Sequence, residues 1–355
     1  MKHSPLLFSR LLFRSLQQSP LQFSALRFYS LRYNPLRYIA NSINAWRDSA
    51  AIGLLLSMLS AHVNAADFDY QLTASEVKPD VYVVGGVAGD LTFKNGGNIL
   101  NTGFIVAEQG VIVIDVGPSR LYGEQLRALI ARTTDKPVIQ VYITHQHPDH
   151  FFGLQAFEGV DTAALPGTIS DLKLLAGDYS DNMYRLIGNA MLGTEIVLPK
   201  SEVLPGVVEV GGRSIELLAL GGHTASDLAV FDKASGVLFA GDLVFHQRAP
   251  TTPSADIPLW LESLAKLKSV PYSVLVPGHG PVSENATPID ETADYVDWLL
   301  TTLQSLAEQG MSMAEALQQK IADRFTSLVV VQNEYERSVV HLYGNIEEGL
   351  LPPIE

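Results

Sequence analysis

Residues 141–150 have the sequence VYITHQHPDH, in which three histidines and an aspartate follow an apolar run typical of a β-strand. Side chains two apart on a strand point to the same side, so His145 and His147 can face one metal ion. The proline after them ends the strand, so Asp149 and His150 turn away and can form a second ligand set. Neutral imidazoles and a carboxylate suit zinc. The stretch predicts a metal site, with a solvated histidine-rich turn as the alternative.

Four further turns place a histidine or an aspartate directly after an apolar run and next to glycine. They contain Asp115, His223, Asp242 and His279. Strand ends can deliver side chains from distant chain positions to one edge of a sheet, and glycine lets the backbone approach closely. A single aspartate after a strand is more often a turn former. Four such turns in order are hard to explain that way and favour one site at a sheet edge.

This ordered set resembles the signature of the metallo-β-lactamase fold superfamily, in which an aspartate precedes HxHxDH and a histidine, an aspartate and a histidine follow. The resemblance covers roughly residues 80–285. It implies an α/β fold, an αββα sandwich, with two zinc ions at its edge. One zinc would be held by His145, His147 and His223. The other would be held by Asp149, His150 and His279, with Asp242 as the bridge. Asp115 would orient the HxHxDH loop by hydrogen bonds.

The charges of such a site predict a hydrolase. Two zinc ions would carry four positive charges against two ligand carboxylates, so a bridging water should lose its proton near neutral pH. That hydroxide would be the nucleophile, and a metal ion would polarise the carbonyl or phosphoryl oxygen of the substrate. The carboxylates of Asp149 and Asp242 are therefore the catalytic groups that we predict. The sequence contains no cysteine, which excludes thiolate ligands, a thiol nucleophile and disulfides.

Longer stretches resemble a narrower group, the quinoprotein relay system zinc metallohydrolases, which are related to the Sox-associated exported metallohydrolases. These stretches are residues 95–106, 114–126, 144–157 and 239–256. The resemblance implies a functional link to a quinoprotein dehydrogenase in pyrroloquinoline-quinone (PQQ)-dependent alcohol oxidation. The expected reaction is hydrolysis of a small ester, thioester or lactone. A β-lactamase is one alternative, and a non-hydrolytic module that binds a quinone or a relay partner is another.

Residues 1–65 are predicted to form a leader with a signal peptide. Residues 1–47 contain seven basic side chains and no acidic one. Residues 50–59 form an apolar run too short to span a bilayer, and small residues precede a cleavage site after Ala65. We expect cleavage there, a periplasmic or secreted protein, and no stable membrane anchor afterwards. A mitochondrial-type transit peptide and an over-extended start are the alternatives.

The remaining chain is acidic and divides into two regions with different predicted secondary structure. It has 37 acidic against 17 basic side chains, so it should repel nucleic acid, and a small molecule is the expected substrate. Residues 66–286, where strand-like runs alternate with helical periods, are predicted to form the metallo-β-lactamase-like domain. Residues 287–355 show helical periodicity alone and are predicted to form a C-terminal helical extension packed on it. Within it, SMAE at 312–315 fits a capping box.

Strands are predicted at 81–86, 103–107, 111–115, 138–144, 214–220, 228–232 and 236–242, and helices at 121–132 and 260–268. His246 and Arg248 follow Asp242 closely enough to contact substrate, with a role in a surface loop as the alternative. Asp227 is expected to cap a turn rather than to orient His223. Packing in the protein interior is the expectation for three further residues, namely Met183, Tyr184 and His341.

Overall fold

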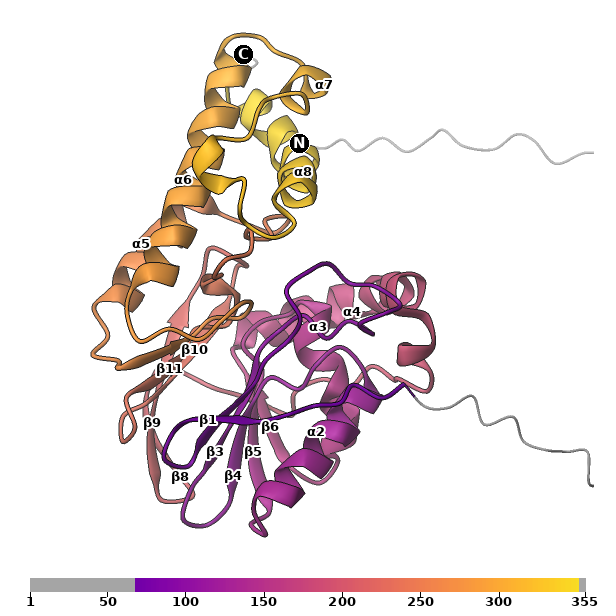
Figure 1. Cartoon of the computed structure of the whole chain (residues 1–355), viewed down its shortest axis with the longest axis vertical. Helices are drawn as coiled ribbons and strands as arrows, with labels where there is room; N and C mark the ends of the chain where they lie inside the picture. Colours follow the sequence, from indigo (N-terminus) through magenta and orange to yellow (C-terminus); the bar gives the residue numbers. More distant parts are fainter. Residues whose placement is uncertain (1–67, 351–355) are drawn as a thin grey trace, which may run out of the picture. The chain divides into compact units, whose positions relative to one another are not determined.

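Two β-sheets pack against each other in the computed structural model, which describes residues 68–350 (Figure 1). The first sheet has seven strands in the order β1 to β7. They are β1 (Ser75–Lys78), β2 (Val81–Val84), β3 (Thr102–Val106), β4 (Val111–Ile114), β5 (Val138–Tyr142), β6 (Asp161–Ala164) and β7 (Ser201–Glu202). Strands β1 to β4 pair antiparallel, and β4 to β7 pair parallel. The predicted leader and its cleavage site lie outside the described residues.

The second sheet has five strands in the order β12-β11-β10-β9-β8. They are β8 (Gly206–Val210), β9 (Arg213–Leu220), β10 (Asp227–Asp232), β11 (Val237–Phe239) and β12 (Val274–Val276). Strands β8 to β11 pair antiparallel, and β11 and β12 pair parallel. A parallel pair needs a crossover, and α5 (Ile257–Lys268) lies between these two strands in the chain.

Helices cover the outer face of each sheet. On the first sheet, α2 (Arg120–Thr133) and α4 (Pro166–Ile187) share a core with β3 and β4. On the second sheet, the core contains α5, α6 (Thr287–Glu308) and α8 (Val331–Leu350). Two short helices complete the described chain, α3 (Pro148–Phe151) and α7 (Met313–Ala316).

The alternation of side chains along the central strands creates the layers. In β4, Val111 and Val113 face the core under α2, whereas Ile112 and Ile114 face the second sheet. Strand β10 alternates in the same way between the inter-sheet core and the core under α5. Both faces of these strands are therefore buried, which is why they consist almost entirely of apolar residues. The predicted αββα sandwich is confirmed.

Some elements could not be predicted from the local sequence. Strands β6 and β7 are short, and β8 is mostly exposed, so none of them has a clear apolar pattern. The strand prediction over 103–115 is confirmed as the antiparallel pair β3–β4. The capping box is also confirmed, because the Ser312 side chain accepts from the Glu315 amide and the Glu315 side chain accepts from the Ser312 amide.

The C-terminal helices share one core with the second sheet. Tyr295 and Leu299 on α6 and Tyr335 on α8 belong to the same buried cluster as Trp260 on α5. The described residues form one compact unit, and the boundary at residue 287 stays a prediction. No helix within residues 68–350 is long and apolar enough to cross a membrane.

Candidate metal centre

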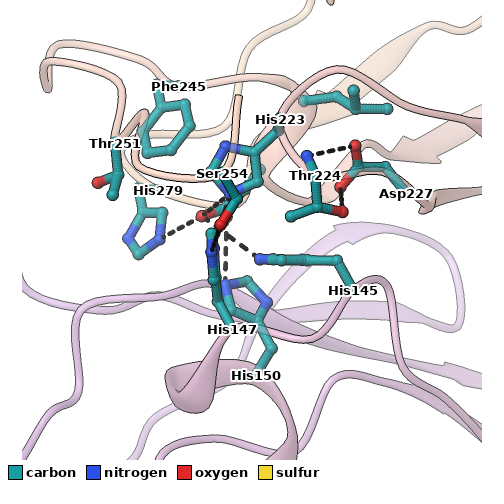
Figure 2. Close-up of polar contacts among 12 residues, drawn as sticks. His145, His147, His150, His223, Thr224, Asp227, Phe245, Thr251, Ser254 and His279 are labelled. Atoms are coloured by element: carbon teal, nitrogen blue, oxygen red, sulfur yellow. Dashed lines mark hydrogen bonds and ion pairs between the residues drawn. The ribbon is translucent and has the colours of Figure 1, made fainter. Parts of the chain in front are cut away.

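The predicted ligands lie in turns that follow strands and converge at one edge of the sandwich. His145 and His147 follow β5, and the one-turn helix α3 then presents Asp149 and His150, with Pro148 at its first position. His223, Asp242 and His279 follow β9, β11 and β12 in turn. Figure 2 shows the five histidines pointing toward one another.

The seven side chains form two groups whose ligand atoms lie within 4.8 Å of one another. One group contains His145, His147, His223 and Asp242, and the other contains Asp149, His150 and His279. Asp242 reaches both groups. Its Oδ2 lies 3.5 Å from His223 Nε2, and its Oδ1 lies 3.2 Å from His150 Nε2. The carboxylate that the sequence resemblance assigns as a bridge therefore stands between the two groups.

Hydrogen bonds at the second ring nitrogen orient three of these histidines. His150 Nδ1 lies 2.8 Å from Asp115 Oδ2, and His279 Nδ1 lies 2.8 Å from the Ile99 carbonyl. His145 Nδ1 lies 3.0 Å from the Thr144 hydroxyl. Each contact fixes the ring and leaves Nε2 facing the centre of the cluster.

Several inward atoms have no hydrogen-bond partner among the described residues. They are buried and comprise His145 Nε2, His150 Nε2, Asp149 Oδ2 and Asp242 Oδ1. Each unpaired buried polar atom costs about 1–3 kcal/mol, so their convergence calls for a ligand that satisfies them together. Imidazole nitrogens and carboxylate oxygens are donors that divalent transition metals accept, and the residues fit two such ions.

Asp115 connects the turn after β4 to the HxHxDH loop. Its carboxylate accepts from the Thr144 amide at 2.9 Å and from the Thr144 hydroxyl at 2.8 Å, in addition to its contact with His150. Its backbone φ is 56°, an unusual value for a residue other than glycine, and such values cluster at functional sites. The structure thus places Asp115 outside the ligand groups, where it orients the loop.

The fold and this cluster agree with a family model. The model described as "Metallo-beta-lactamase superfamily" matches residues 95–279, which is more than half of the chain. The chain belongs to the metallo-β-lactamase superfamily.

Two curated relatives show the range of this superfamily. A linear primary-alkylsulfatase from Pseudomonas sp. is 20% identical over 292 residues, which are 70% of this chain and 55% of that protein. An atrochrysone carboxyl ACP thioesterase from Aspergillus fumigatus is 27% identical over 207 residues, 58% of this chain and 57% of that protein. The chain thus spans little more than half the length of these relatives.

Among solved structures, a metallo-β-lactamase from Pontibacter korlensis superposes with a TM-score of 0.52 at 22% identity. The match covers 64% of this chain and 99% of that one. At this identity the likeness shows the shared fold alone. The alkylsulfatase and the thioesterase are hydrolases by name, and this chain carries a cluster of His and Asp side chains that could hold metal ions.

Burial keeps the first group of histidines neutral. It lowers the pKa of His145 and His223 well below the usual histidine range and lowers the pKa of His147 to about 4. Neutral imidazole is the form that binds metal, so these three side chains need not release protons before coordination at neutral pH.

His150 has the opposite shift. Burial alone would lower its pKa, but the surrounding carboxylates, Asp242 foremost, outweigh burial and raise the pKa well above its ordinary value. Burial likewise disfavours the charge of Asp242, but His279 and His150 hold the pKa of this carboxyl well below its ordinary value. The charged His150 and Asp242 stabilise each other in the metal-free cluster.

The metal-free protein should lose stability as the pH falls from 6.5 towards 4. In this window the unfolded chain protonates His145, His147 and His223, whereas the folded chain does not. Each of them lowers the free energy of unfolding by about 1.4 kcal/mol per pH unit. His150 is protonated in the folded state throughout this window, and its opposing slope vanishes within about one pH unit below 6.5 as the unfolded chain also becomes protonated. Urea unfolding of the chelator-treated protein at several pH values measures this slope.

The variant His147→Gln isolates the effect from other acid-sensitive groups, because glutamine does not titrate. The free energy of unfolding of this variant should change less steeply with pH than that of the natural protein. The difference between the two slopes should equal the contribution of one histidine. Identical slopes for the two proteins would contradict the prediction.

A pocket of about 490 Å³ opens beside the cluster. His147, Asp149, Asp242 and His279 form part of its wall. Ser254 also lies there, with its hydroxyl 3.5 Å from His147 Nε2 (Figure 2). Pockets of this size accommodate small molecules, so a substrate can reach the candidate metal-binding side chains in the wall.

The two predicted substrate-contact residues occupy different environments. Arg248 lies in the pocket wall and is 3% exposed. His246 does not line the pocket, and its Nδ1 is 2.8 Å from the Pro281 carbonyl. The structure therefore places Arg248, and not His246, in the wall of the pocket.

Other pocket residues were missed by the sequence analysis. Tyr179 from α4 and Arg337 from α8 line the pocket, as does His341. The expectation that His341 packs in the interior is wrong, because its side chain is exposed at the pocket wall. Its apolar neighbours in sequence suggested packing, but residues adjacent on a helix point in different directions. No local signal marks these positions, since only the packing of α4 and α8 brings them to the site.

The remaining packing and turn expectations have mixed outcomes. Met183 is fully buried in the core, as predicted, whereas Tyr184 is 40% exposed, contrary to the prediction. Asp227 accepts hydrogen bonds from the amide and the hydroxyl of Thr224, so its role as a turn cap is confirmed (Figure 2).

Proposed function

We propose that this chain is an exported zinc-dependent hydrolase that cleaves a small ester, thioester or lactone. The observation that carries the proposal is the position of Asp242 between two groups of ligand atoms, several of which are buried and have no hydrogen-bond partner among the described residues. Bound zinc ions would supply Lewis-acid polarisation of the substrate and lower the pKa of a coordinated water. The protein residues would hold the ions and position the substrate.

Each residue has a defined task in this proposal. Asp242 and Asp149 would supply the negative charge that offsets the ions, and Asp242, which reaches both ligand groups, would help to hold both ions. Asp115 restrains His150 and the loop before it, so the ligands keep their orientation during turnover. The pocket wall excludes water from the bound substrate and orients the bond to be cleaved.

Two considerations favour acyl substrates. One curated relative is named as an ACP thioesterase, so this fold acts on an acyl thioester in at least that protein. The ligand set also lacks the zinc-binding cysteine of one large class of β-lactamases, which makes the β-lactamase alternative weaker. The narrower proposal, a quinoprotein relay metallohydrolase linked to PQQ-dependent alcohol oxidation, rests on the four sequence stretches, and export rests on the leader.

The test combines metal content with a substrate panel. The chain without residues 1–65 is purified with zinc supplied, and bound metals are counted by elemental analysis. Hydrolysis is then measured with thioester, lactone and ester substrates and with nitrocefin, before and after chelation. We expect two zinc ions per chain and acyl hydrolysis that chelation abolishes.

Other outcomes would replace the proposal. Turnover of nitrocefin alone would favour the β-lactamase alternative. Little bound metal, or hydrolysis that persists after complete metal removal, would contradict the zinc hydrolase. A protein that binds metal but hydrolyses none of these substrates would favour the non-hydrolytic binding module.

A further inference from the structure

The C-terminal helix α8 forms part of the pocket that contains the candidate metal ligands. Arg337 and His341 are four residues apart on this helix, so they lie on the same face, and both line the pocket. Figure 1 shows α8 in yellow at the C-terminal end of the described chain, beside α6. Part of the pocket wall thus comes from an element outside the matched residues 95–279.

A buried carboxylate holds Arg337 in place. Glu334, one turn before it on α8, is fully buried and accepts from Arg337 Nη1 at 2.8 Å. The same oxygen accepts from Arg248 Nη2 at 3.1 Å and from the Thr251 hydroxyl at 2.9 Å. One carboxylate therefore faces two guanidinium groups, and the orientation of Arg337 is set before any ligand arrives.

The rest of the Arg337 guanidinium is available. Among the described residues, no acceptor lies within hydrogen-bond distance of its Nε or Nη2, and its side chain is 39% exposed. The nearest further carboxylate is Asp90, at 3.6 Å from Nη2, and the other oxygen of Asp90 is 2.7 Å from Asn333 Nδ2. The Nε and Nη2 groups of a planar guanidinium are adjacent donors, and together they match the two oxygens of a carboxylate.

The pocket is lined by apolar side chains in addition to these polar groups. Leu91, Ile99 and Leu186 belong to its wall. A substrate with a short hydrocarbon segment fits such a lining, since the segment is removed from water while its charged end meets arginine.

We propose that Arg337, assisted by His341, binds a carboxylate carried by the substrate at a distance from the bond that is cleaved. The substrate class is then an acidic acyl compound, such as a half-ester of a dicarboxylic acid. This inference rests on the proposed function, because it names the substrate class for the same site. Arg337 and His341 are specificity-determining residues in this proposal and take no part in bond cleavage.

The experiment compares two esters that differ only in charge. The zinc-loaded protein is assayed with p-nitrophenyl hydrogen glutarate and with its neutral analogue, methyl p-nitrophenyl glutarate. Arg337→Gln should lower kcat/KM for the acidic ester about 10- to 100-fold, mainly through KM, and change the neutral ester by less than about 2-fold. Arg337→Lys should lower kcat/KM for the acidic ester by an intermediate factor, because lysine keeps the positive charge but lacks the paired donors of the guanidinium. His341→Gln should lower it by a smaller factor.

The matched control is Arg324→Gln. Arg324 also bonds an aspartate in the C-terminal region, Asp294, but lies outside the pocket. Its loss should leave both esters unaffected. Equal losses of both esters in Arg337→Gln, or no loss of the acidic one, would overturn the inference. If Arg337→Gln unfolds at a lower temperature, the exposed His341→Gln variant provides the comparison.

A binding measurement separates this inference from the proposed function. Calorimetry measures the affinity of monomethyl glutarate, with dimethyl glutarate as the neutral reference, for the natural protein and for Arg337→Gln. If neither ester is hydrolysed but Arg337→Gln weakens binding of the acid alone by about 10-fold or more, the hydrolase proposal fails and takes the substrate assignment with it, while the role of Arg337 in binding a carboxylate stands. If hydrolysis occurs but charge makes no difference, the inference fails and the hydrolase proposal stands.

Discussion

Asp242→Ala is expected to lower hydrolysis by about 10³-fold or more and to reduce bound zinc from two ions towards one per chain. Asp242 lies within reach of histidines from both ligand groups. Its removal takes away several kcal/mol of metal-dependent stabilisation of the transition state, which corresponds to this factor. Elemental analysis and a thioester assay on the same preparation measure both effects.

The control for this variant is Asp232→Asn. Asp232 is another fully buried carboxylate, on β10, but it pairs with Arg213 at 2.7 Å and not with the ligands. Loss of a buried ion pair should lower the free energy of unfolding while the metal content stays at two. Full zinc content and full activity in Asp242→Ala would mean that Asp242 does not hold the ions.

Gly278→Ala is expected to disrupt the metal centre without removing a ligand. A Cβ at Gly278 would lie 1.9 Å from Asp242 Oδ1 and 2.7 Å from the carbonyl carbon of Gly241. The backbone cannot move away easily, because the Gly278 amide donates to the carbonyls of Gly241 and Val244, at 2.8 and 3.0 Å. Overpacking of this kind costs about 1–3 kcal/mol, and the displaced carboxylate should lower zinc content and activity together. Urea unfolding and elemental analysis measure the two effects.

Gly177→Ala is the matched control. Gly177 lies within α4, where an added Cβ would meet nothing within 4 Å. Alanine there should stabilise the protein by about 0.5–1 kcal/mol because it restricts the unfolded chain and favours the helix. A Gly278→Ala protein with natural stability and natural zinc content would show that the turn before His279 has room to adapt.

The central strands were predictable because they are buried on both faces, whereas the αββα order of the layers came from the resemblance to the superfamily. The apolar runs of such strands, as in β4 and in residues 228–231 of β10, are visible in the sequence without knowledge of the partner strands. Strand β8 was not predictable, since none of its residues is fully buried and Val207 is exposed. Its position is fixed by pairing with β9, which is a contact made only in the folded chain.

The order of the metal-binding residues was likewise visible in the sequence, and their chemistry follows from residue type and spacing. The spacing of His145 and His147 in the turn after β5 is local, as is the turn of α3 that presents Asp149 and His150. The resemblance to the superfamily signature then supplied the grouping of ligands, and the atoms of each group lie together in the structure.

The sequence by itself determined the layered fold and the identity of the ligand-bearing turns, because strand periodicity and side-chain chemistry are short-range properties. Only the tertiary structure decided which ring nitrogens face the centre, since His279 is oriented by the distant Ile99 carbonyl. It also decided that α8 supplies Arg337 and His341 to the pocket. Such contacts depend on how helices pack onto sheets. Packing is driven by the burial of apolar side chains, which determines which residues lie in the interior. It does not determine which residues distant in sequence contact each other.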